Sequence, residues 1–255
     1  MPVDYNIFMS APIAISALSA WILASRPRTL FAAAAPVMVG SAIAIRDDGF
    51  ALWPALAALL GAFLLQVGSN LANDVFDFQR GADAPDRVGP VRVTQAGFLT
   101  PAQVILGMWI VFALSLIPGL YLAARGGWPV VAIGVSAIAA AILYTGGPLP
   151  YGYKGLGEIF VFVFFGIVAA SGTYYVQTSM LTWLAISAGV PIGLLTSAIL
   201  GVNNLRDIGS DQAAGKSRSQ CASACVARAL STCCSSGWRL PPRPLSSQRG
   251  LHPPG

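Results

Sequence analysis

The chain has 255 residues, of which 55% are hydrophobic and only 10% are charged. Soluble domains carry about 25% charged residues, so this composition excludes an ordinary soluble globular protein and favours a chain embedded in lipid. The net charge of +5 does not indicate a nucleic-acid partner, because residues 1–216 hold ten basic and ten acidic residues and the whole excess lies in 217–255.

The first segment, residues 5–25, contains no charged residue. Asp4 and the lack of a positively charged start argue against a signal peptide. We expect an interfacial helix that enters the membrane at Trp21, followed by Arg26 and Arg28 at the boundary. A seventh membrane span is the alternative.

Long stretches without Asp, Glu, Lys or Arg follow, at 29–45, 49–73, 93–124, 126–153 and 159–205. A spanning helix needs about 20 mostly apolar residues, and helices satisfy their own backbone hydrogen bonds in lipid. The last stretch is long enough for two helices, divided at Gln177-Thr178-Ser179. The sequence therefore predicts an all-α polytopic transmembrane bundle with six spans, near 30–46, 51–73, 101–123, 128–145, 157–177 and 182–204.

The basic residues predict the orientation of this bundle, because cytoplasmic loops are enriched in Lys and Arg. With the N-terminus inside, the outer loops contain only Arg46 and Arg125. The inner loops contain the other eight basic residues before position 217: Arg26, Arg28, Arg80, Arg87, Arg92, Lys154, Arg206 and Lys216. We expect an integral protein of the plasma (inner) membrane with the loops after the second and sixth spans on the cytoplasmic face.

Those two loops carry six of the ten acids in the chain. Asn70, Asp74 and Asp77 are spaced i, i+4, i+7, which places them on one helical face. The second set, Asn203, Asp207 and Asp211, is spaced i, i+4, i+8. Single Asp and Asn residues near helix ends are often capping residues, but polar groups at membrane depth tend to be functional.

Carboxylates at close range repel each other unless a cation lies between them, and Mg²⁺ combines carboxylates with substrate phosphates. Arg suits phosphate oxygens. We therefore expect a site for a long allylic diphosphate. The catalytic candidates are Asp74, Asp77, Asp207 and Asp211. The metal candidates are these four and Asp83. The substrate-binding candidates are Asn70, Asn73, Arg87, Arg92, Tyr144, Lys154, Asn203, Arg206 and Lys216. The phenylalanines at 160–165 are interpreted as lipid or core contacts.

Two segments resemble the aspartate-rich motifs of the UbiA prenyltransferase superfamily. The first is Asn70-Leu-Ala-Asn-Asp-Val-Phe-Asp-Phe-Gln-Arg-Gly-Ala-Asp83, and the second runs from Asn203-Asn-Leu-Arg-Asp through Lys216. The continuation of the first motif through Gln95 and the entry Ala24-Ser-Arg-Pro-Arg-Thr-Leu30 are similar to the branch that uses 1,4-dihydroxy-2-naphthoate. Gly81 stands where many superfamily members have a further acid, which favours this branch over 4-hydroxybenzoate enzymes.

The resemblance implies a helical bundle around a cavity that opens to lipid, with Mg²⁺ held by the two motifs. It implies transfer of a polyprenyl group from its diphosphate to 1,4-dihydroxy-2-naphthoate, with loss of CO₂, to give demethylmenaquinone in menaquinone biosynthesis. Membrane lipid surrounds the protein, and neither a nucleic acid nor an obligate protein partner is implied. The alternatives are another aromatic acceptor such as 4-hydroxybenzoate, an inactive fragment and a cation-coupled transporter.

The composition changes abruptly after Lys216. Family members would continue with about three more spans, but residues 217–255 are rich in Arg, Ser, Pro and Cys and contain no run that could cross a bilayer. We interpret 1–216 as an incomplete prenyltransferase domain and 217–255 as a disordered, frameshifted tail. A genuine disordered tail is the alternative.

Overall fold

The computed structural model describes residues 15–81, 89–148 and 150–206. Within these ranges the chain forms helices and no strand. The helices are α1 (Ala17–Ser25), α2 (Pro27–Arg46), α3 (Leu52–Gln79), α4 (Pro101–Gly126), α5 (Trp128–Leu143), the 3₁₀ turn η2 (Tyr151–Lys154), α6 (Gly157–Val161), the π-helix η3 (Phe162–Val168), α7 (Ala169–Thr178) and α8 (Trp183–Arg206).

The predicted all-helical polytopic bundle is confirmed. Five helical segments are long and apolar enough to cross a membrane, namely α2, α3, α4, the continuous run Gly157–Thr178 and α8. The span predicted at 128–145 is the shorter helix α5, which has 16 residues and is about 24 Å long at 1.5 Å per residue. It ends early because Gly146, Gly147 and Pro148 follow, and Gly147 has a positive φ of 71°.

The interfacial helix expected at Trp21 corresponds to α1, which has nine residues and is too short to cross a bilayer. Its indole packs over Gly107 of α4, where an added Cβ would lie 2.6 Å from the Trp21 ring. Residues 1–14 lie outside the described ranges, so the alternative of a seventh span stays untested.

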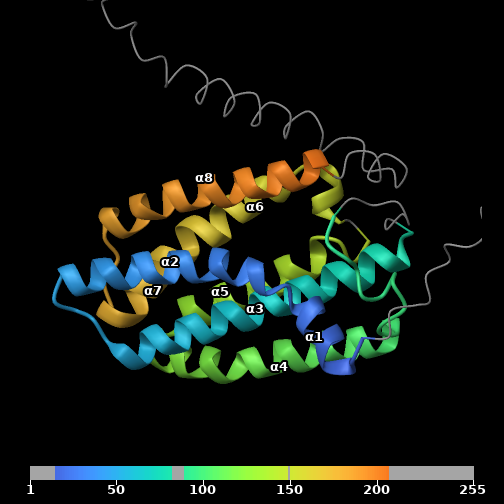
Figure 1. Ribbon diagram of the computed structural model, residues 1–255. Coiled ribbons are helices and arrows are strands. Elements are labelled where there is room, and N and C mark those ends of the chain that lie inside the picture. The colour runs from blue at the N-terminus through green and yellow to red at the C-terminus, as the bar shows by residue number, and fades with distance from the viewer. Residues whose placement is uncertain (1–14, 82–88, 149, 207–255) are drawn as a thin grey trace, which may run out of the picture.

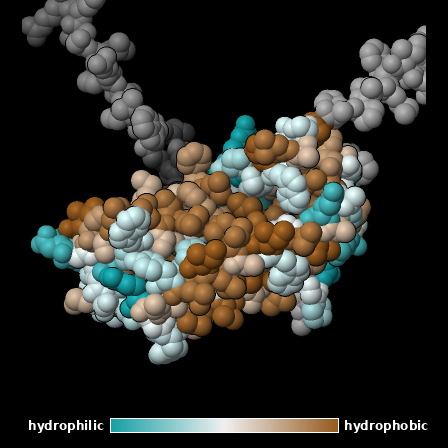
Figure 2. Space-filling model, turned by 90° about the horizontal axis from the view of Figure 1, so that it is seen from below, coloured by the Kyte–Doolittle hydropathy of each residue, from teal (hydrophilic) through white to brown (hydrophobic). Residues whose placement is uncertain are grey.

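The helices run back and forth along one direction, with α3 beside α4, α2 beside α7 and α8 beside η3 (Figure 1). The surface seen from below is apolar across its centre and more hydrophilic towards its ends (Figure 2). Large apolar side chains are also exposed elsewhere among the described residues, such as Phe31 (80% exposed), Ile117 (67%) and Trp183 (85%). Such exposure suits a lipid solvent, because apolar side chains gain nothing by leaving hydrocarbon.

One end of the bundle collects the C-terminal ends of α3 and α8, the start of α4 and the loop that carries η2 (Figure 1). Thr100 and Gln103 form a capping box that begins α4, and Pro101 occupies its first turn. The preceding loop buries Val93 and Leu99 in the core around Leu71 and Val75 of α3. This loop is therefore held against the end of α3 that carries the first polar cluster.

Small residues allow close helix crossings, as is common in membrane bundles. Gly40 of α2 faces α7, where an added Cβ would overlap the carbonyl oxygen of Ala170 and approach Thr173 Cβ to 2.9 Å. We expect Gly40→Ala to lower the free energy of unfolding by about 1–3 kcal/mol, as overpacking does. Gly134→Ala is the control, because a Cβ at Gly134 meets nothing within 4 Å. Thermal unfolding in detergent compares them, and equal melting temperatures would contradict the crossing.

Candidate active site

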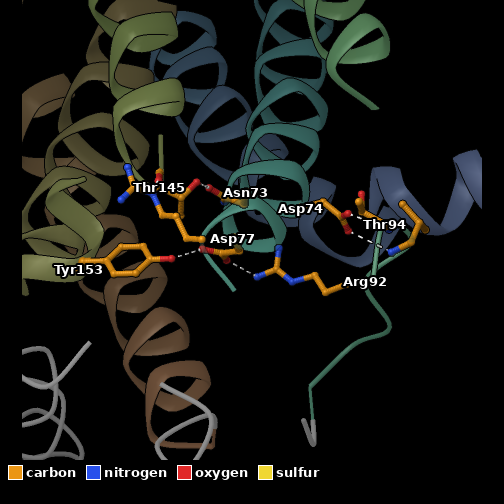
Figure 3. Close-up of polar contacts among 9 residues, drawn as sticks. Asn73, Asp74, Asp77, Arg92, Thr94, Thr145 and Tyr153 are labelled. Carbon is orange, nitrogen blue, oxygen red and sulfur yellow. Dashed lines mark hydrogen bonds and ion pairs between the residues drawn. The ribbon is translucent and has the colours of Figure 1, made fainter. Parts of the chain in front are cut away.

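The last turns of α3 carry the polar side chains Asn70, Asn73, Asp74 and Asp77, of which Asn70 (4% exposed), Asp74 (2%) and Asp77 (2%) are buried. They do not share a single environment. Asp74 bonds to the loop before α4, Asn73 bonds to the α5–α6 connection, and Asp77 bonds to both (Figure 3). Asn70, Asp74 and Asp77 were predicted to share one helical face, but each of them bonds to a different set of partners.

Asp77 is the centre of the first set. Arg92 donates from Nη2 to Asp77 Oδ2 at 2.7 Å, in an ion pair whose side chains are 6% and 3% exposed. Tyr153 of η2 donates its hydroxyl to the other carboxylate oxygen at 2.7 Å. Charge-assisted bonds of this length are strong. Asp77 thus joins α3, the loop before α4 and the loop before α6 at one point (Figure 3).

Asp74 makes a different set of bonds. Its two carboxylate oxygens accept the backbone N–H groups of Val93 and Thr94, each at 3.1 Å. Both partners directly follow Arg92, the residue that pairs with Asp77. Asp74 therefore fixes the backbone that presents Arg92, although its own carboxylate lies apart from Asp77 (Figure 3).

Asn73 and Arg80 tie α3 to the turn after α5. Thr145 donates its hydroxyl to Asn73 Oδ1 at 3.0 Å. Arg80 donates from Nε to the carbonyl oxygen of Thr145 at 2.9 Å and from Nη2 to that of Gly147, and its guanidinium carbon lies 5.7 Å from the centroid of the Tyr153 ring. The site predicted from sequence did not include Arg80 or Thr145, because their partners are neighbours only in the fold.

Asn70 belongs to a third set, at the junction of α1 and α2. Its amide nitrogen donates to the carbonyl oxygen of Ser25 and to Thr29 Oγ1, both at 2.9 Å. Gln66, one turn deeper on α3, donates from Nε2 to Thr29 Oγ1 at 3.1 Å and to Asn70 Oδ1 at 3.3 Å. Neither Gln66 nor Thr29 was expected at the site.

Below these polar groups lies a cavity of about 510 Å³, lined mainly by apolar residues of α2 to α5, the α6–η3–α7 run and α8. Asn70 and Asn73 line its polar end together with Arg26 and Gln66. The predicted residue Tyr144 also lines it. A cavity of this kind suits a ligand with a long apolar tail and a polar head.

An aromatic row forms part of the cavity wall. Tyr144 meets Tyr151 edge-on at 5.4 Å, Tyr151 stacks on Phe160 at 4.1 Å, and Phe160 stacks on Phe164 at 6.2 Å between centroids. The phenylalanines of this run were interpreted as lipid or core contacts, and Phe160, Phe164 and Phe165 among them also line the cavity. Burial raises the pKa of Tyr151 to about 12, so its hydroxyl stays protonated and donates to the carbonyl oxygen of Ala140.

The second predicted cluster is described only in part. Asn203 and Arg206 lie in the last turn of α8, at the same end of the bundle as Asp77 (Figure 1). Asn204 donates to Glu158 Oε1 of α6 at 2.9 Å, which fixes the end of α8. Lys154 follows Tyr153 in η2.

The other predicted site residues lie outside the described ranges: Asp83, Arg87, Asp207, Asp211 and Lys216. Among the described residues alone, no group of three His, Cys, Asp or Glu could hold a metal.

These features define a polytopic helical membrane protein in which a buried carboxylate–arginine centre, Asp77 and Arg92, lies one helical turn from Asn73, a residue that lines a mainly apolar cavity. The pattern described as the UbiA prenyltransferase family matches residues 33–229, and the chain belongs to this family.

Among curated proteins, the chain is 43% identical over 202 residues to the 1,4-dihydroxy-2-naphthoate octaprenyltransferase of Mycobacterium tuberculosis, covering 79% of this chain and 69% of that protein. It is 42% identical over 208 residues to the enzyme of the same name from Escherichia coli, covering 79% and 68%. It is 30% identical over 217 residues to the 2-carboxy-1,4-naphthoquinone phytyltransferase of a Synechocystis strain, covering 81% and 68%.

Proposed function

We propose that this protein transfers a polyprenyl group from an allylic diphosphate to 1,4-dihydroxy-2-naphthoate, with loss of CO₂, to give demethylmenaquinol, the reduced form of demethylmenaquinone. The observation that carries the proposal is the pairing of a polar head site around Asp77 with an apolar cavity of about 510 Å³. The names of the relatives favour the naphthoate acceptor over 4-hydroxybenzoate. Acids gathered at one end of the bundle also favour an enzyme over a cation-coupled transporter, whose ion sites lie near mid-membrane.

The donor set at the head of the cavity suits a magnesium ion. Asn73 and Asp77 are one helical turn apart and offer amide and carboxylate oxygens, which Mg²⁺ prefers. We propose that Asp77 holds the ion together with Asp83, Asp207 and Asp211, while Asn73 and Asn203 contact the substrate head. Bound Mg²⁺ would neutralise negative charge that develops on the departing diphosphate.

The basic residues around Asp77 would bind the diphosphate head directly. Arg92 already presents its guanidinium at Asp77, and we propose that Arg87, Arg206, Lys154 and Lys216 complete a cationic rim. These donors become more effective as charge develops on the leaving group, because they are oriented before the reaction begins. When the allylic C–O bond breaks, its electron pair leaves with the diphosphate.

The wall of the cavity would protect the allylic carbon after this bond breaks. Apolar walls exclude water, which would otherwise capture the cation. The faces of Tyr144, Tyr151 and Phe160 can stabilise a nearby positive charge. The cation then bonds to the ring carbon that carries the carboxylate. The carboxylate leaves as CO₂ and its bonding electrons return to the ring, so the product is the quinol, and oxidation of the quinol to the quinone is a separate two-electron step.

We propose that the Asp77 end faces the cytoplasm across the inner membrane. Of the basic residues in the described ranges, Arg26, Arg28, Arg80, Arg92, Lys154 and Arg206 lie at that end of the helices, and Arg46 and Arg125 lie at the other. Asp47 and Asp48 directly follow Arg46, so that end of the bundle has no excess of positive charge around Arg46. This asymmetry follows the enrichment of Lys and Arg in cytoplasmic loops.

The length of the prenyl tail would be limited by the space in the cavity. Gly172 of α7 lines the cavity, and a Cβ there meets nothing within 4 Å. We expect Gly172→Phe to lower the transfer of long prenyl groups by about tenfold or more relative to geranyl, given about 1–3 kcal/mol for overfilling. The ratio of the two rates in a membrane assay measures this, with Gly172→Ala as the control. An unchanged ratio would place the tail elsewhere.

The function itself is tested by giving the reconstituted protein a polyprenyl diphosphate, Mg²⁺ and either naphthoate or 4-hydroxybenzoate. We expect prenylated product with the naphthoate and little with the benzoate. The reverse preference would replace the proposed acceptor.

A further inference from the structure

Ser69 of α3 places a hydroxyl in the cavity below the Asp77 centre. The residue lines the cavity and is half-buried. No hydrogen bond joins its Oγ atom to another of the described residues, and this atom, unlike Gln66 Oε1, is not enclosed from solvent. A serine in a helix commonly donates to the carbonyl oxygen three or four residues before it, and Ser115 does so to Phe112 at 2.7 Å. The hydroxyl of Ser69 is therefore available to a ligand in the cavity.

The surroundings of Ser69 combine a second neutral polar group with aromatic rings. Asn73 lies one helical turn further along α3 and also lines the cavity, so the two side chains are neighbours on one face of the helix. The Thr145 hydroxyl bonds to Asn73 at 3.0 Å (Figure 3), which brings the preceding residue, Tyr144, close to this turn of α3. The Tyr144 ring meets Tyr151 edge-on at 5.4 Å in the aromatic row of the cavity wall. A flat aromatic ligand can lie against such faces.

The chemistry around Ser69 matches one part of the two proposed substrates. Ser69 precedes Asp77 by eight residues of α3, or about 12 Å along the helix axis, so it lies below the diphosphate head. The prenyl tail has no polar atom and would leave the Ser69 hydroxyl without a partner, which is unfavourable. The aromatic acid carries two ring hydroxyls. Its 1-hydroxyl lies beside the carboxylate and bonds to it within the molecule, so the 4-hydroxyl is the one that needs a partner from the protein.

We propose that Ser69 recognises the aromatic acceptor, with Ser69 Oγ accepting a hydrogen bond from the 4-hydroxyl of 1,4-dihydroxy-2-naphthoate. The naphthalene ring then lies between α3 and the rings of Tyr144 and Tyr151, while Asn73, which is nearer to Asp77, contacts the substrate head. This assignment rests on the proposed prenyl transfer. It names the residue that distinguishes the dihydroxy acid from an acid without the 4-hydroxyl.

The test compares two acids that differ only in the 4-hydroxyl, and it needs no turnover. The acids 1,4-dihydroxy-2-naphthoate and 1-hydroxy-2-naphthoate are titrated into the full chain in lipid nanodiscs under nitrogen, because the dihydroxy acid oxidises in air. Their naphthalene fluorescence reports binding. We expect the wild type to bind the dihydroxy acid about 3–10-fold more tightly, as one hydrogen bond between neutral groups provides. Ser69→Ala should remove this preference and leave the affinity for 1-hydroxy-2-naphthoate within about twofold of the wild type.

Ser115→Ala is the matched control. Ser115 lines the same cavity, but its hydroxyl is already bonded to the carbonyl oxygen of Phe112, so this variant should keep the preference for the dihydroxy acid. Alanine is a strong helix former, so neither substitution disturbs its helix. Binding of 1-hydroxy-2-naphthoate also reports the integrity of each variant, because a misfolded protein would lose both acids.

The assignment is overturned if Ser69→Ala keeps the wild-type preference for the dihydroxy acid, or if it weakens both acids equally. If the wild type binds both acids alike, the 4-hydroxyl has no partner in the cavity, and the assignment fails while the proposed prenyl transfer is unaffected. If the wild type binds neither acid, the proposed function fails together with the assignment.

Discussion

Replacing Asp77 with Asn is expected to lower prenyl transfer by about 10³-fold, which corresponds to the loss of several kcal/mol of charge stabilisation at the head of the cavity. The variant removes the carboxylate on which Arg92 and Tyr153 converge at 2.7 Å. Initial rates with saturating naphthoate and a labelled polyprenyl diphosphate measure the effect. Asp48→Asn, at the opposite end of the bundle, is the control and should keep full activity.

A purely structural role for the Asp77–Arg92 pair would also lower activity, because removing one partner of a buried pair costs about 3–5 kcal/mol of stability. The double variant Asp77→Asn/Arg92→Gln leaves no lone buried charge and should recover most of the lost stability. We expect it to remain inactive. Recovery of transfer together with stability would contradict a catalytic role for Asp77.

Replacing Asp74 with Ala is expected to lower kcat/KM by about 10–100-fold, the range seen when a group that orients a ligand or catalytic residue is lost. The Mg²⁺ concentration for half-maximal activity should stay unchanged, because both oxygens of Asp74 bind the backbone of Val93 and Thr94. Asp74→Asn keeps one accepting oxygen and should lose less. The Mg²⁺ titration separates this positioning role from the metal-ligand role expected from sequence.

A readout independent of activity is tryptic cleavage after Arg92, which is 6% exposed in the intact fold. Asp74→Ala should free the loop and speed the appearance of the fragment that begins at Val93. A large rise in the required Mg²⁺ without faster cleavage would show that Asp74 is a metal ligand after all.

The helices could be predicted from the sequence because lipid imposes a simple rule: a long charge-free stretch must satisfy its backbone as a helix. The ends of α2, α4 and α8 lie within a few residues of the expected bounds. The length of α5 could not be read from apolar content alone, because the stop at Gly146 and Gly147 depends on local turn geometry.

The site could be predicted only where its residues are close in sequence. Helical spacing brought Asn70, Asp74 and Asp77 to one end of α3, but each residue turns to a different partner. Those partners, such as Arg92 and Thr145, come from loops whose paths no spacing rule gives.

Arg26 and Gln66 were missed for the same reason. Arg26 lines the cavity at the left-handed break between α1 and α2, and Gln66 lies about two turns deeper than Asp74 and three turns deeper than Asp77. The only signal in the sequence was a polar Gln inside an otherwise apolar stretch, and polar groups at membrane depth are usually functional.

The most direct measurement reconstitutes the full chain in liposomes with Mg²⁺, a polyprenyl diphosphate and 1,4-dihydroxy-2-naphthoate labelled in its carboxyl carbon. Mass spectrometry follows the quinone product while the released gas is counted. The proposed function predicts one labelled CO₂ for each prenyl group transferred, together with demethylmenaquinol, which air oxidises to demethylmenaquinone before detection. Prenylated product that keeps its label, or no prenylated naphthoquinone in the presence of both substrates, would contradict it.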